Sequence, residues 1–293
     1  MDITLALGGG GAKGNSHIGV IRRLEKEGYK IRSVAGTSFG GIVAILFALG
    51  NSPDKIQSIF ETVDQSKLYT RGPEDGPSLL GLFGVRKWLD EVVGEKTFDD
   101  LRIPCAVTAV DINSGVEIML SEGRLKDAIL ATIALPGIFP TLRLNDWELM
   151  DGGVLNPVPV SIARILSPDL PIIAVVLNDP MDKPVQSYSI PMPSMLPRSI
   201  VERITRMNFA QSLDIFMRGV DVSSRAVSHF RLELDAPDVI VRPKVHGIGL
   251  LDKVVVADVI MLGEQAVEEV LPQIKRVTSW QNRVGKKLFG ARR

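Results

Sequence analysis

The chain has 293 residues, which is long enough to bury a hydrophobic core without support from a metal or from disulfides. Lysine plus arginine and aspartate plus glutamate each number 34, so no net positive field favours nucleic acid as a partner. The single cysteine, Cys105, lies in an apolar run, which predicts a buried thiol and excludes a disulfide framework within one chain.

The first 50 residues alternate predicted strands and helices. A strand is expected over residues 2–7, where β-favouring apolar residues lead directly into a run of glycines. An amphipathic helix follows and stops at Gly28, a short second strand covers residues 31–35, and an apolar helix covers residues 40–49. Because strands that alternate with helices usually pair in parallel, this order predicts a covered parallel sheet.

The remaining predicted elements fit the same plan. The segments with strand character are residues 105–111, 116–120, 172–177 and 239–241. Helices are predicted over residues 124–134 and 254–270, and the second should be closed by Leu271 and Pro272. We therefore expect a three-layer α/β/α fold with a mainly parallel central sheet, formed by a single domain over residues 1–278.

Two segments break this alternation. Residues 64–86 are rich in glycine, proline and mixed charge, as expected of a surface excursion or a lid, and residues 179–200 contain five prolines. Both segments could border the entrance of a site. The helix expected after the second segment is apolar around much of its circumference, which fits either a core helix or a pliable wall for an acyl chain. Its apolar residues are Ile204, Met207, Phe209, Leu213, Ile215, Phe216 and Met217.

The two ends of the chain bear on localisation. A glycine loop begins after only seven residues, which leaves no room for a secretion signal, and the longest apolar run, Ile42 to Leu49, is too short to cross a bilayer. We therefore expect a cytoplasmic protein. Residues 279–293 carry five cations beside several apolar residues, so this tail either makes peripheral contact with a membrane or is a frayed, solvated end.

A glycine-rich loop follows the first predicted strand. Its main-chain N–H groups are not crowded by side chains, so they can hold either a phosphate or the oxyanion of an acyl-transfer reaction. The spacing of Gly9, Gly11 and Gly14 matches a dinucleotide-binding loop, but the second strand does not end in the acidic residue that such a loop requires. Lys13 is followed by glycine rather than by serine or threonine, which argues against a triphosphate loop.

Ser38 is the candidate nucleophile. It directly follows the second predicted strand and precedes the apolar helix, and Gly36 and Gly40 remove side chains from both sides of the tight turn. The positive end of the following helix is directed at the hydroxyl and lowers the cost of forming an alkoxide. This arrangement resembles a nucleophile elbow, so we favour acyl transfer over nucleotide binding.

A serine nucleophile needs a base. The three histidines of the chain are His17, His229 and His246. Only one strand–helix unit precedes Ser38, which is too few for the usual histidine triad of an α/β-hydrolase. Asp151 is the better candidate, because it ends a strand-like segment before Gly152 and Gly153, on a tight turn that other backbone can approach. Burial would raise its pKa toward working pH.

Four motifs in one order resemble the patatin-like phospholipase family over roughly residues 3–160. They are Gly9-Gly10-Gly11-Ala12-Lys13-Gly14, Gly36-Thr37-Ser38-Phe39-Gly40, residues 131–140 (ATIALPGIFP) and Asp151-Gly152-Gly153. The resemblance implies that Ser38 is the nucleophile and Asp151 the base, and that Gly10 and Gly11 donate the N–H groups of the oxyanion hole. It also implies that Gly9 and Gly14 shape the loop and that Lys13 supports the loop or an anionic head group. Many relatives carry serine where Thr132 stands.

The implied protein is a lipid acyl hydrolase of the phospholipase A, lysophospholipase or carboxylesterase type. It would cleave a carboxylic ester of a lipid through an acyl-enzyme, as a serine esterase without a metal or a cofactor. Two alternatives stay open at this point: transfer of the acyl group to an acceptor other than water, and a lipid-binding protein without turnover. The sequence does not determine the head group, the chain length or the oligomeric state.

Overall fold

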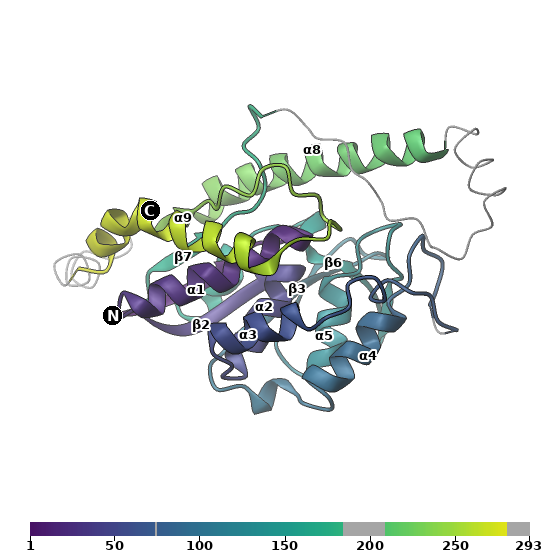
Figure 1. Ribbon diagram of the computed structural model, residues 1–293, viewed down its shortest axis with the longest axis horizontal. Helices are drawn as coiled ribbons and strands as arrows, with labels where there is room; N and C mark the ends of the chain where they lie inside the picture. Colours follow the sequence, from purple (N-terminus) through teal and green to yellow (C-terminus); the bar gives the residue numbers. More distant parts are fainter. Residues whose placement is uncertain (74, 184–208, 280–293) are drawn as a thin grey trace.

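The computed structural model describes residues 1–73, 75–183 and 209–279. Over these residues, helices cover both faces of one central sheet, which confirms the predicted layered α/β architecture (Figure 1). The strands are β1 Asp2–Leu7, β2 Lys30–Thr37, β3 Cys105–Asp111, β4 Glu117–Leu120, β5 Leu142–Leu144, β6 Trp147–Asp151, β7 Ile172–Val175 and β8 Val239–Val241. The six strands expected from the sequence correspond to β1, β2, β3, β4, β7 and β8, and the strand-like segment before Asp151 is β6.

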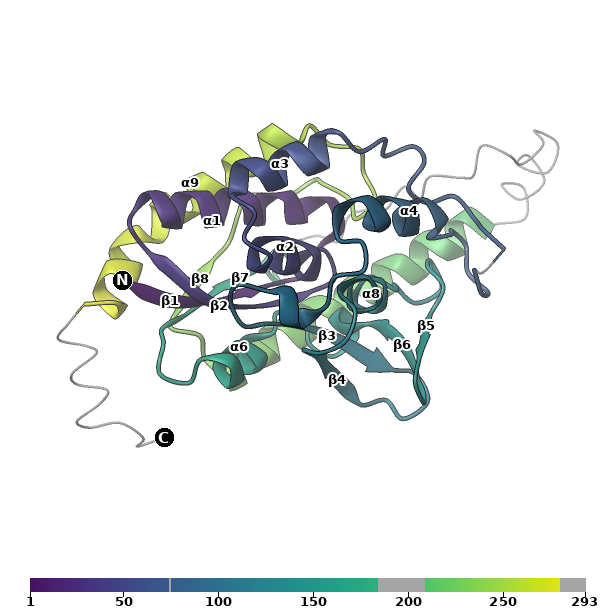
Figure 2. The same ribbon diagram turned by 90° about the horizontal axis from the view of Figure 1, so that it is seen from below.

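The helices form the two outer layers. They are α1 Ser16–Lys26, α2 Phe39–Ala48, α3 Pro53–Glu61, α4 Phe83–Val92, α5 Leu125–Thr132, α6 Val160–Leu166, α8 Phe209–Asp235 and α9 Val256–Val277, with short 3-10 turns η1 Gly11–Asn15, η2 Phe98–Asp100 and η3 Gly152–Val154. Figure 2 shows α1, α2, α3 and α9 on one face of the sheet and α6 on the other. The C-terminal part of α8 joins α6, where Leu232 is buried against it.

The strands carry large side chains toward one face and small ones toward the other. Leu5 and Leu7 belong to the larger hydrophobic cluster, which also contains residues of α1, α2 and α9. Ala6 and Ala35 belong to a second cluster beneath α6. Because successive strand residues point to opposite faces, both kinds are buried, and the strands appear in the sequence as continuous apolar runs. Cys105 is buried in the larger cluster, and desolvation raises the pKa of its thiol.

The strand order positions the candidate site. The sheet runs β5-β6-β3-β2-β1-β7-β8, with β4 also paired to β3. The pairs from β3 to β8 along this path are parallel, whereas β4, β5 and β6 add an antiparallel part. The register pairs Leu7 with Gly36 and Ala109 with Asp151. The carboxyl ends of β1, β2 and β6 therefore lie at one edge of the sheet, which is where ligands bind in open α/β folds.

Helix α9 does not end where the sequence predicts. The helix continues through Pro272 to Val277, although proline at this position cannot donate its intrahelical hydrogen bond. Ile274 is completely buried, and Thr278 is buried with its hydroxyl donating to the Ile274 carbonyl oxygen at 2.8 Å. Burial of the turn after the proline compensates for the lost bond, so the expected stop at Leu271 and Pro272 was wrong.

The first irregular segment is exposed over much of its length, as expected of a surface excursion, and becomes buried toward its end. Residues 64–82 contain no long helix, but Leu80 and Leu82 are buried and α4 begins at Phe83, inside the region expected to be an excursion. The second irregular segment lies outside the described residues from position 184 to 208. Of the apolar residues expected in the following helix, Met217 is buried, whereas Ile215 and Phe216 are exposed, which contradicts a core helix at these two positions. Ile204, Met207 and the side chains of Phe209 and Leu213 are not described.

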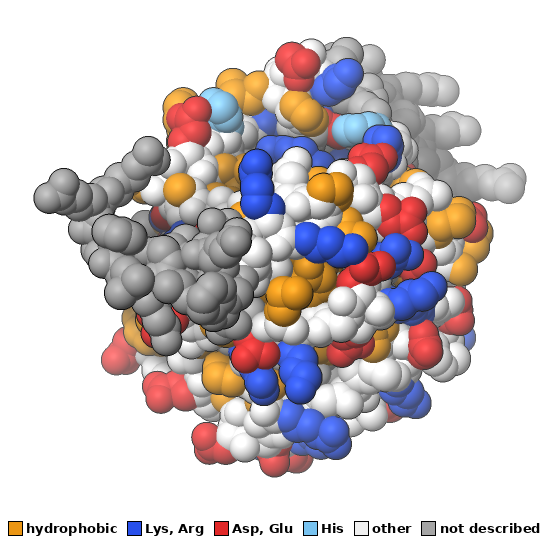
Figure 3. Space-filling model, turned by 90° about the vertical axis from the view of Figure 1, so that its left-hand side faces the viewer, with side chains coloured by type: hydrophobic (Ala, Val, Ile, Leu, Met, Phe, Trp, Pro, Cys, Tyr) orange, Lys and Arg blue, Asp and Glu red, His pale blue; other side chains and the backbone are white. Residues whose placement is uncertain are grey.

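The predicted tail, residues 279–293, lies outside the described part of the chain except for Ser279, so its contact with a membrane stays a prediction. Among the described helices, none combines the length and the apolar character needed to cross a bilayer. The described residues also contain no cluster of histidine, cysteine, aspartate and glutamate with the geometry of a metal site. Acidic and basic side chains are intermingled on the face shown in Figure 3.

Candidate active site

Ser38 occupies a strained turn between β2 and α2. Its backbone φ is 54° and its ψ is −128°, a conformation that non-glycine residues rarely adopt. Gly36 and Gly40 make this turn feasible, since a Cβ on Gly40 would lie 2.3 Å from the Leu7 carbonyl oxygen. A Cβ on Gly36 would lie 2.5 Å from the Gly40 carbonyl oxygen. The glycines of the motif therefore allow the start of α2 to pack directly on β1 and β2.

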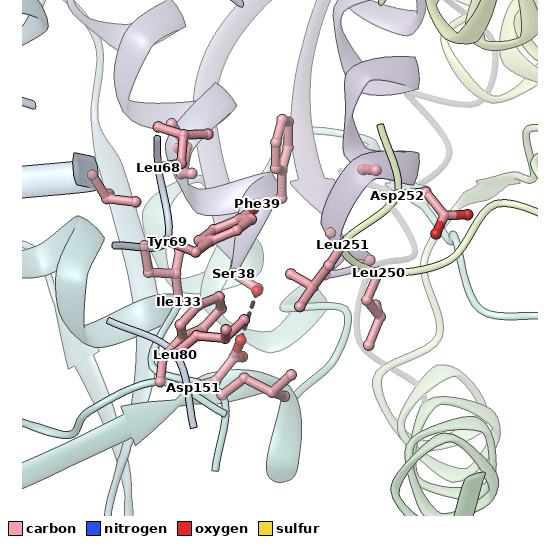
Figure 4. A pocket seen from close by; sticks show the side chains of 18 of the residues that line it. Ser38, Phe39, Leu68, Tyr69, Leu80, Ile133, Asp151, Leu250, Leu251 and Asp252 are labelled. Atoms are coloured by element: carbon pink, nitrogen blue, oxygen red, sulfur yellow. Dashed lines mark hydrogen bonds between the residues drawn. The ribbon is translucent and has the colours of Figure 1, made fainter. Parts of the chain in front are cut away.

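The side chain of Ser38 meets that of Asp151. The Ser38 Oγ donates a hydrogen bond to the Asp151 Oδ2 at 2.6 Å (Figure 4). The Gly153 N–H donates to the Asp151 Oδ1 at 2.7 Å. A Cβ on Gly152 would lie 2.1 Å from the Thr108 hydroxyl oxygen, so the glycine brings the turn after β6 onto β3. The two residues predicted as nucleophile and base are thus in direct contact, although 113 positions separate them.

Burial gives Asp151 the pKa of a usable base. The residue is 5% exposed, and desolvation raises the pKa of its carboxyl from 3.8 to about 6. The hydrogen bonds from Ser38 and Gly153 act in the opposite direction, because they stabilise the carboxylate. A base that is still ionised at neutral pH but has a raised proton affinity is suited to accept a proton from a serine hydroxyl.

We expect a pH profile that reports this group. Because Asp151 must be ionised to accept a proton, kcat/KM for an ester should fall about tenfold per pH unit below a midpoint near pH 6. An ordinary aspartate would keep its activity down to about pH 4. Steady-state rates across this range, with tryptophan fluorescence as a check on folding, test the expectation. A profile without an acid limb above about pH 4.5 would contradict it.

The histidines do not form a triad with Ser38. His17 is buried and contacts the Gly8 carbonyl oxygen through its Nε2 at 2.7 Å. His229 is exposed beside Glu233 on α8, and the Nδ1 of His246 bonds to Asp179. None of the three has a hydrogen bond to the Ser38 hydroxyl. The structure therefore offers no histidine base at this serine, in line with the sequence expectation.

The glycine loop leaves two N–H groups available next to Ser38. The Gly9 N–H donates to the Pro157 carbonyl oxygen at 2.9 Å, and the Ala12 N–H donates to the Leu250 carbonyl oxygen at 2.9 Å. Between them, the N–H groups of Gly10 and Gly11 have no acceptor among the described residues. Gly10 and Gly11 line the same cavity as Ser38. These N–H groups have the environment required of an oxyanion hole.

His17 fixes the start of this loop, which the sequence did not indicate. Desolvation lowers the pKa of His17 to about 4, so its ring is neutral and its Nε2–H donates to the Gly8 carbonyl oxygen. The following N–H, of Gly9, is held by Pro157. The peptide unit between Gly8 and Gly9 is thus fixed at both its carbonyl and its N–H group, immediately before the two free N–H groups.

Gly14 and Lys13 support the loop in different ways. A Cβ on Gly14 would lie 2.2 Å from the Phe39 ring, so this glycine lets η1 pack against the first residue of α2. Lys13 is 6% exposed and is not part of the cavity wall around Ser38. Of the two roles expected for Lys13, this position agrees with support of the loop and not with contact to a head group in the cavity.

A cavity of about 1000 Å³ opens over Ser38 and Asp151. This volume is at the upper end of the range of about 300–1,000 Å³ found for small-molecule sites. One side is apolar and aromatic: Phe39 stacks on Phe60 with 4.9 Å between ring centroids, and Tyr69 lies 5.1 Å from Phe139. Burial raises the pKa of Tyr69 to about 12. The aromatic surface of this side is therefore suited to a hydrocarbon chain.

The opposite side of the cavity is more polar. Asn178 follows β7, Asp221 and Ser224 lie on α8, and Asp252 and Lys253 follow β8. Figure 4 shows Leu250, Leu251 and Asp252 across the site from Leu68 and Tyr69, with Ser38 and Asp151 between the two groups. The wall residues of this polar side come from segments far apart in the chain and carry no common sequence signal, so sequence analysis did not identify them, whereas Leu68 and Tyr69 lie in the segment 64–86 that was expected to border a site.

The mainly parallel sheet, the strained serine after β2 and its buried aspartate partner define an α/β protein with a serine–aspartate site. Residues 5–164, more than half of the chain, match the sequence model of patatin-like phospholipase. The chain belongs to the patatin-like phospholipase family, as the four motifs predicted.

Curated relatives agree with this membership. An uncharacterized NTE family protein of Mycobacterium tuberculosis (strain ATCC 25618 / H37Rv) is 35% identical over 179 residues, which cover 60% of this chain and 49% of the relative. Patatin-like phospholipase domain-containing protein 6 of Homo sapiens is 31% identical over 169 residues, covering 55% of this chain and 12% of that protein. The chain thus matches about half of the first relative and a small part of the second.

The crystal structure of VipD from Legionella pneumophila superimposes with a TM-score of 0.57 at 13% identity, covering 92% of this chain and 66% of that one. At this identity the likeness concerns the fold alone. It extends over more of the chain than the matched family region, which ends at residue 164.

Proposed function

We propose that the protein is a lipid acyl hydrolase that cleaves carboxylic esters through an acyl-enzyme on Ser38. The observation that carries the proposal is the 2.6 Å hydrogen bond from the Ser38 hydroxyl to the buried Asp151 carboxylate, at the base of a largely apolar cavity. Membership of the patatin-like phospholipase family supports a lipid hydrolase. The name of the human relative, a patatin-like phospholipase domain-containing protein, points in the same direction.

In the first half of the proposed reaction, Ser38 Oγ attacks the ester carbonyl carbon while its proton passes to Asp151. The carbonyl oxygen becomes an oxyanion, which the N–H groups of Gly10 and Gly11 stabilise. When the tetrahedral intermediate collapses, the bond to the alkoxy oxygen breaks, and the leaving alcohol takes the proton from Asp151. The acyl group is then bound to Ser38 as an ester.

In the second half, Asp151 accepts a proton from water, and the resulting hydroxide attacks the acyl carbon. Collapse of the second intermediate breaks the bond to Ser38 Oγ, which regains the proton from Asp151, and the carboxylic acid is released. No other reactant is needed, so atoms and charges balance over the cycle. An alcohol in place of water would give acyl transfer through the same steps.

The two sides of the cavity suit the two parts of a lipid ester. The acyl chain would lie against the aromatic side, where Phe60, Tyr69 and Trp88 offer apolar ring surfaces. The alcohol part would lie between α8 and the segment after β8, where Asn178, Ser224 and Lys253 offer hydrogen-bonding groups. This orientation places the ester carbonyl carbon between the two sides, over Ser38.

The test is a substrate panel for the purified protein. We expect release of free fatty acid from p-nitrophenyl butyrate, from a palmitoyl lysophospholipid or from a dipalmitoyl phospholipid, measured by mass spectrometry with Ser38→Ala as the blank. A fluorophosphonate should label Ser38, forming an Oγ–P bond with loss of fluoride. Glycerol or a lysolipid is added as a competing acyl acceptor.

The outcomes separate the candidate functions. Free fatty acid as the main product supports a hydrolase, whereas a new ester of the added acceptor would identify an acyltransferase. Lipid binding without turnover, combined with an unlabelled Ser38, would contradict the proposal and support a lipid-binding protein.

A further inference from the structure

We propose that the C-terminal turn of α5, through the hydroxyl of Thr132, is the element that positions the nucleophile against its base. Thr132 would be a positioning residue that acts through Ser38 without contacting substrate. The proposal rests on the proposed function, because it concerns the same serine–aspartate site. Its evidence is a set of hydrogen bonds that join this one turn to both Ser38 and Asp151.

The first bond fixes the backbone of the nucleophile. The Ser38 N–H donates to the Thr132 Oγ1 at 2.8 Å, and Thr132 is completely buried. On the other side of Ser38, its carbonyl oxygen accepts from the N–H groups of Gly41 and Ile42. The strained φ of 54° is therefore held from both sides, and only the bond on the N–H side comes from a side chain of another element.

The second bond fixes the backbone of the base. The Asp151 N–H donates to the Ala134 carbonyl oxygen at 2.9 Å, two residues after Thr132 on the same turn. Ile133, between these two residues, lines the cavity beside Ser38 and Asp151 (Figure 4). This short turn thus joins the backbones of Ser38 and Asp151 directly, in addition to the sheet, where β2 and β6 both pair with β3.

The hydroxyl of Thr132 has a further chemical consequence. Because it accepts the Ser38 N–H, that N–H is not available to an oxyanion, whereas the N–H groups of Gly10 and Gly11 are. Without the hydroxyl, the N–H of Ser38 would have no acceptor within the protein and the strained turn would relax toward one. A small rotation of this turn moves the Ser38 Oγ away from the Asp151 carboxylate.

The experiment compares Thr132→Val, which keeps the shape but loses the hydroxyl, with Thr132→Ser, which keeps the hydroxyl. For Thr132→Val we expect kcat to fall about 10- to 100-fold with KM nearly unchanged, because a misplacement of about 1 Å can cost about 100-fold. The rate of fluorophosphonate labelling of Ser38 should fall in parallel. Thr132→Ser should recover most of both rates.

A pH profile distinguishes positioning from a merely structural role. The hydrogen bond from Ser38 lowers the pKa of Asp151, so separating the two groups should move the acid limb of kcat/KM toward higher pH in Thr132→Val but not in Thr132→Ser. A variant that is only less stable would keep the wild-type limb. If Thr132→Val does not fold, Thr132→Ala and Thr132→Ser give the same comparison, since they differ by one oxygen atom.

Equal kcat and equal acid limbs in Thr132→Val and Thr132→Ser, or in the alanine and serine pair, would overturn the inference while leaving the proposed function intact. A wild-type protein that neither hydrolyses esters nor reacts with the fluorophosphonate would overturn both. Labelling of the wild type is thus the measurement that separates the two failures.

Discussion

Replacement of Asp151 by asparagine is expected to lower kcat/KM for ester hydrolysis by about four orders of magnitude, the size of effect seen when the acid of a catalytic triad is replaced by its amide. Asparagine has the shape of aspartate and can still accept from the Gly153 N–H, but it cannot take the proton of Ser38. The loss should therefore lie in kcat and in fluorophosphonate labelling, with little change in KM.

Matched variants give this prediction its controls. Ser38→Ala should be as inactive as Asp151→Asn, because removing either member of a dyad removes the same step. His246→Ala should keep most of the wild-type rate, since His246 bonds to Asp179 rather than to Ser38. An inactive but folded His246→Ala variant, or an Asp151→Asn variant within about tenfold of wild type, would contradict the aspartate as the base.

The same substitution should stabilise the fold, which makes inactivation distinguishable from unfolding. A pKa raised from 3.8 to about 6 means that the folded state binds the Asp151 proton more tightly than the unfolded state does. The contribution of the Asp151 carboxyl to the free energy of unfolding of the wild type is therefore fully present below pH 3.8 and is lost as the pH rises to about 6. At pH 8, urea unfolding should show Asp151→Asn to be more stable by up to about 3 kcal/mol, with the difference shrinking toward pH 4.

The sequence could indicate Ser38, Asp151 and the glycine loop because their signals are local. Glycines beside a serine after a strand specify a tight turn wherever it occurs in the fold, and the parallel order of β1 and β2 then brings the loop next to Ser38. The layered architecture followed from the same alternation of strand and helix. The contact between Ser38 and Asp151 additionally needs the antiparallel pairing of β6 with β3, which no local pattern specified.

The features that the sequence did not yield depend on distant contacts. A proline predicts a helix end from local sterics alone, but burial of Ile274 decides the outcome in α9. The cavity wall includes Tyr69 from the segment 64–86 that was expected to border a site, but it also includes Trp88 and Leu250, which no period or motif indicated. Thr132 stood out only as a departure from the serine of many relatives, and the role proposed for it rests on a hydrogen bond that spans 94 positions.

Replacement of Gly11 by alanine tests the oxyanion loop independently of the dyad. The φ of Gly11 is +56°, and a Cβ there would lie 2.0 Å from the Leu250 carbonyl oxygen, which accepts the Ala12 N–H. The clash involves backbone on both sides, so the loop must move and carry the N–H groups of Gly10 and Gly11 with it. We expect kcat to fall by about 100- to 1,000-fold, as for loss of an oxyanion donor.

Gly28→Ala is the matched control for this variant. Gly28 also has a positive φ, of +82°, but a Cβ there would meet no heavy atom within 4 Å. Both variants incur the conformational penalty of alanine at a left-handed position, and only Gly11→Ala displaces the loop. Rates measured at matched folded fraction should therefore be normal for Gly28→Ala and strongly reduced for Gly11→Ala. If both kept wild-type kcat, the oxyanion would have to be stabilised by N–H groups outside this loop, and Phe39, the residue after the nucleophile, would be the next donor to examine.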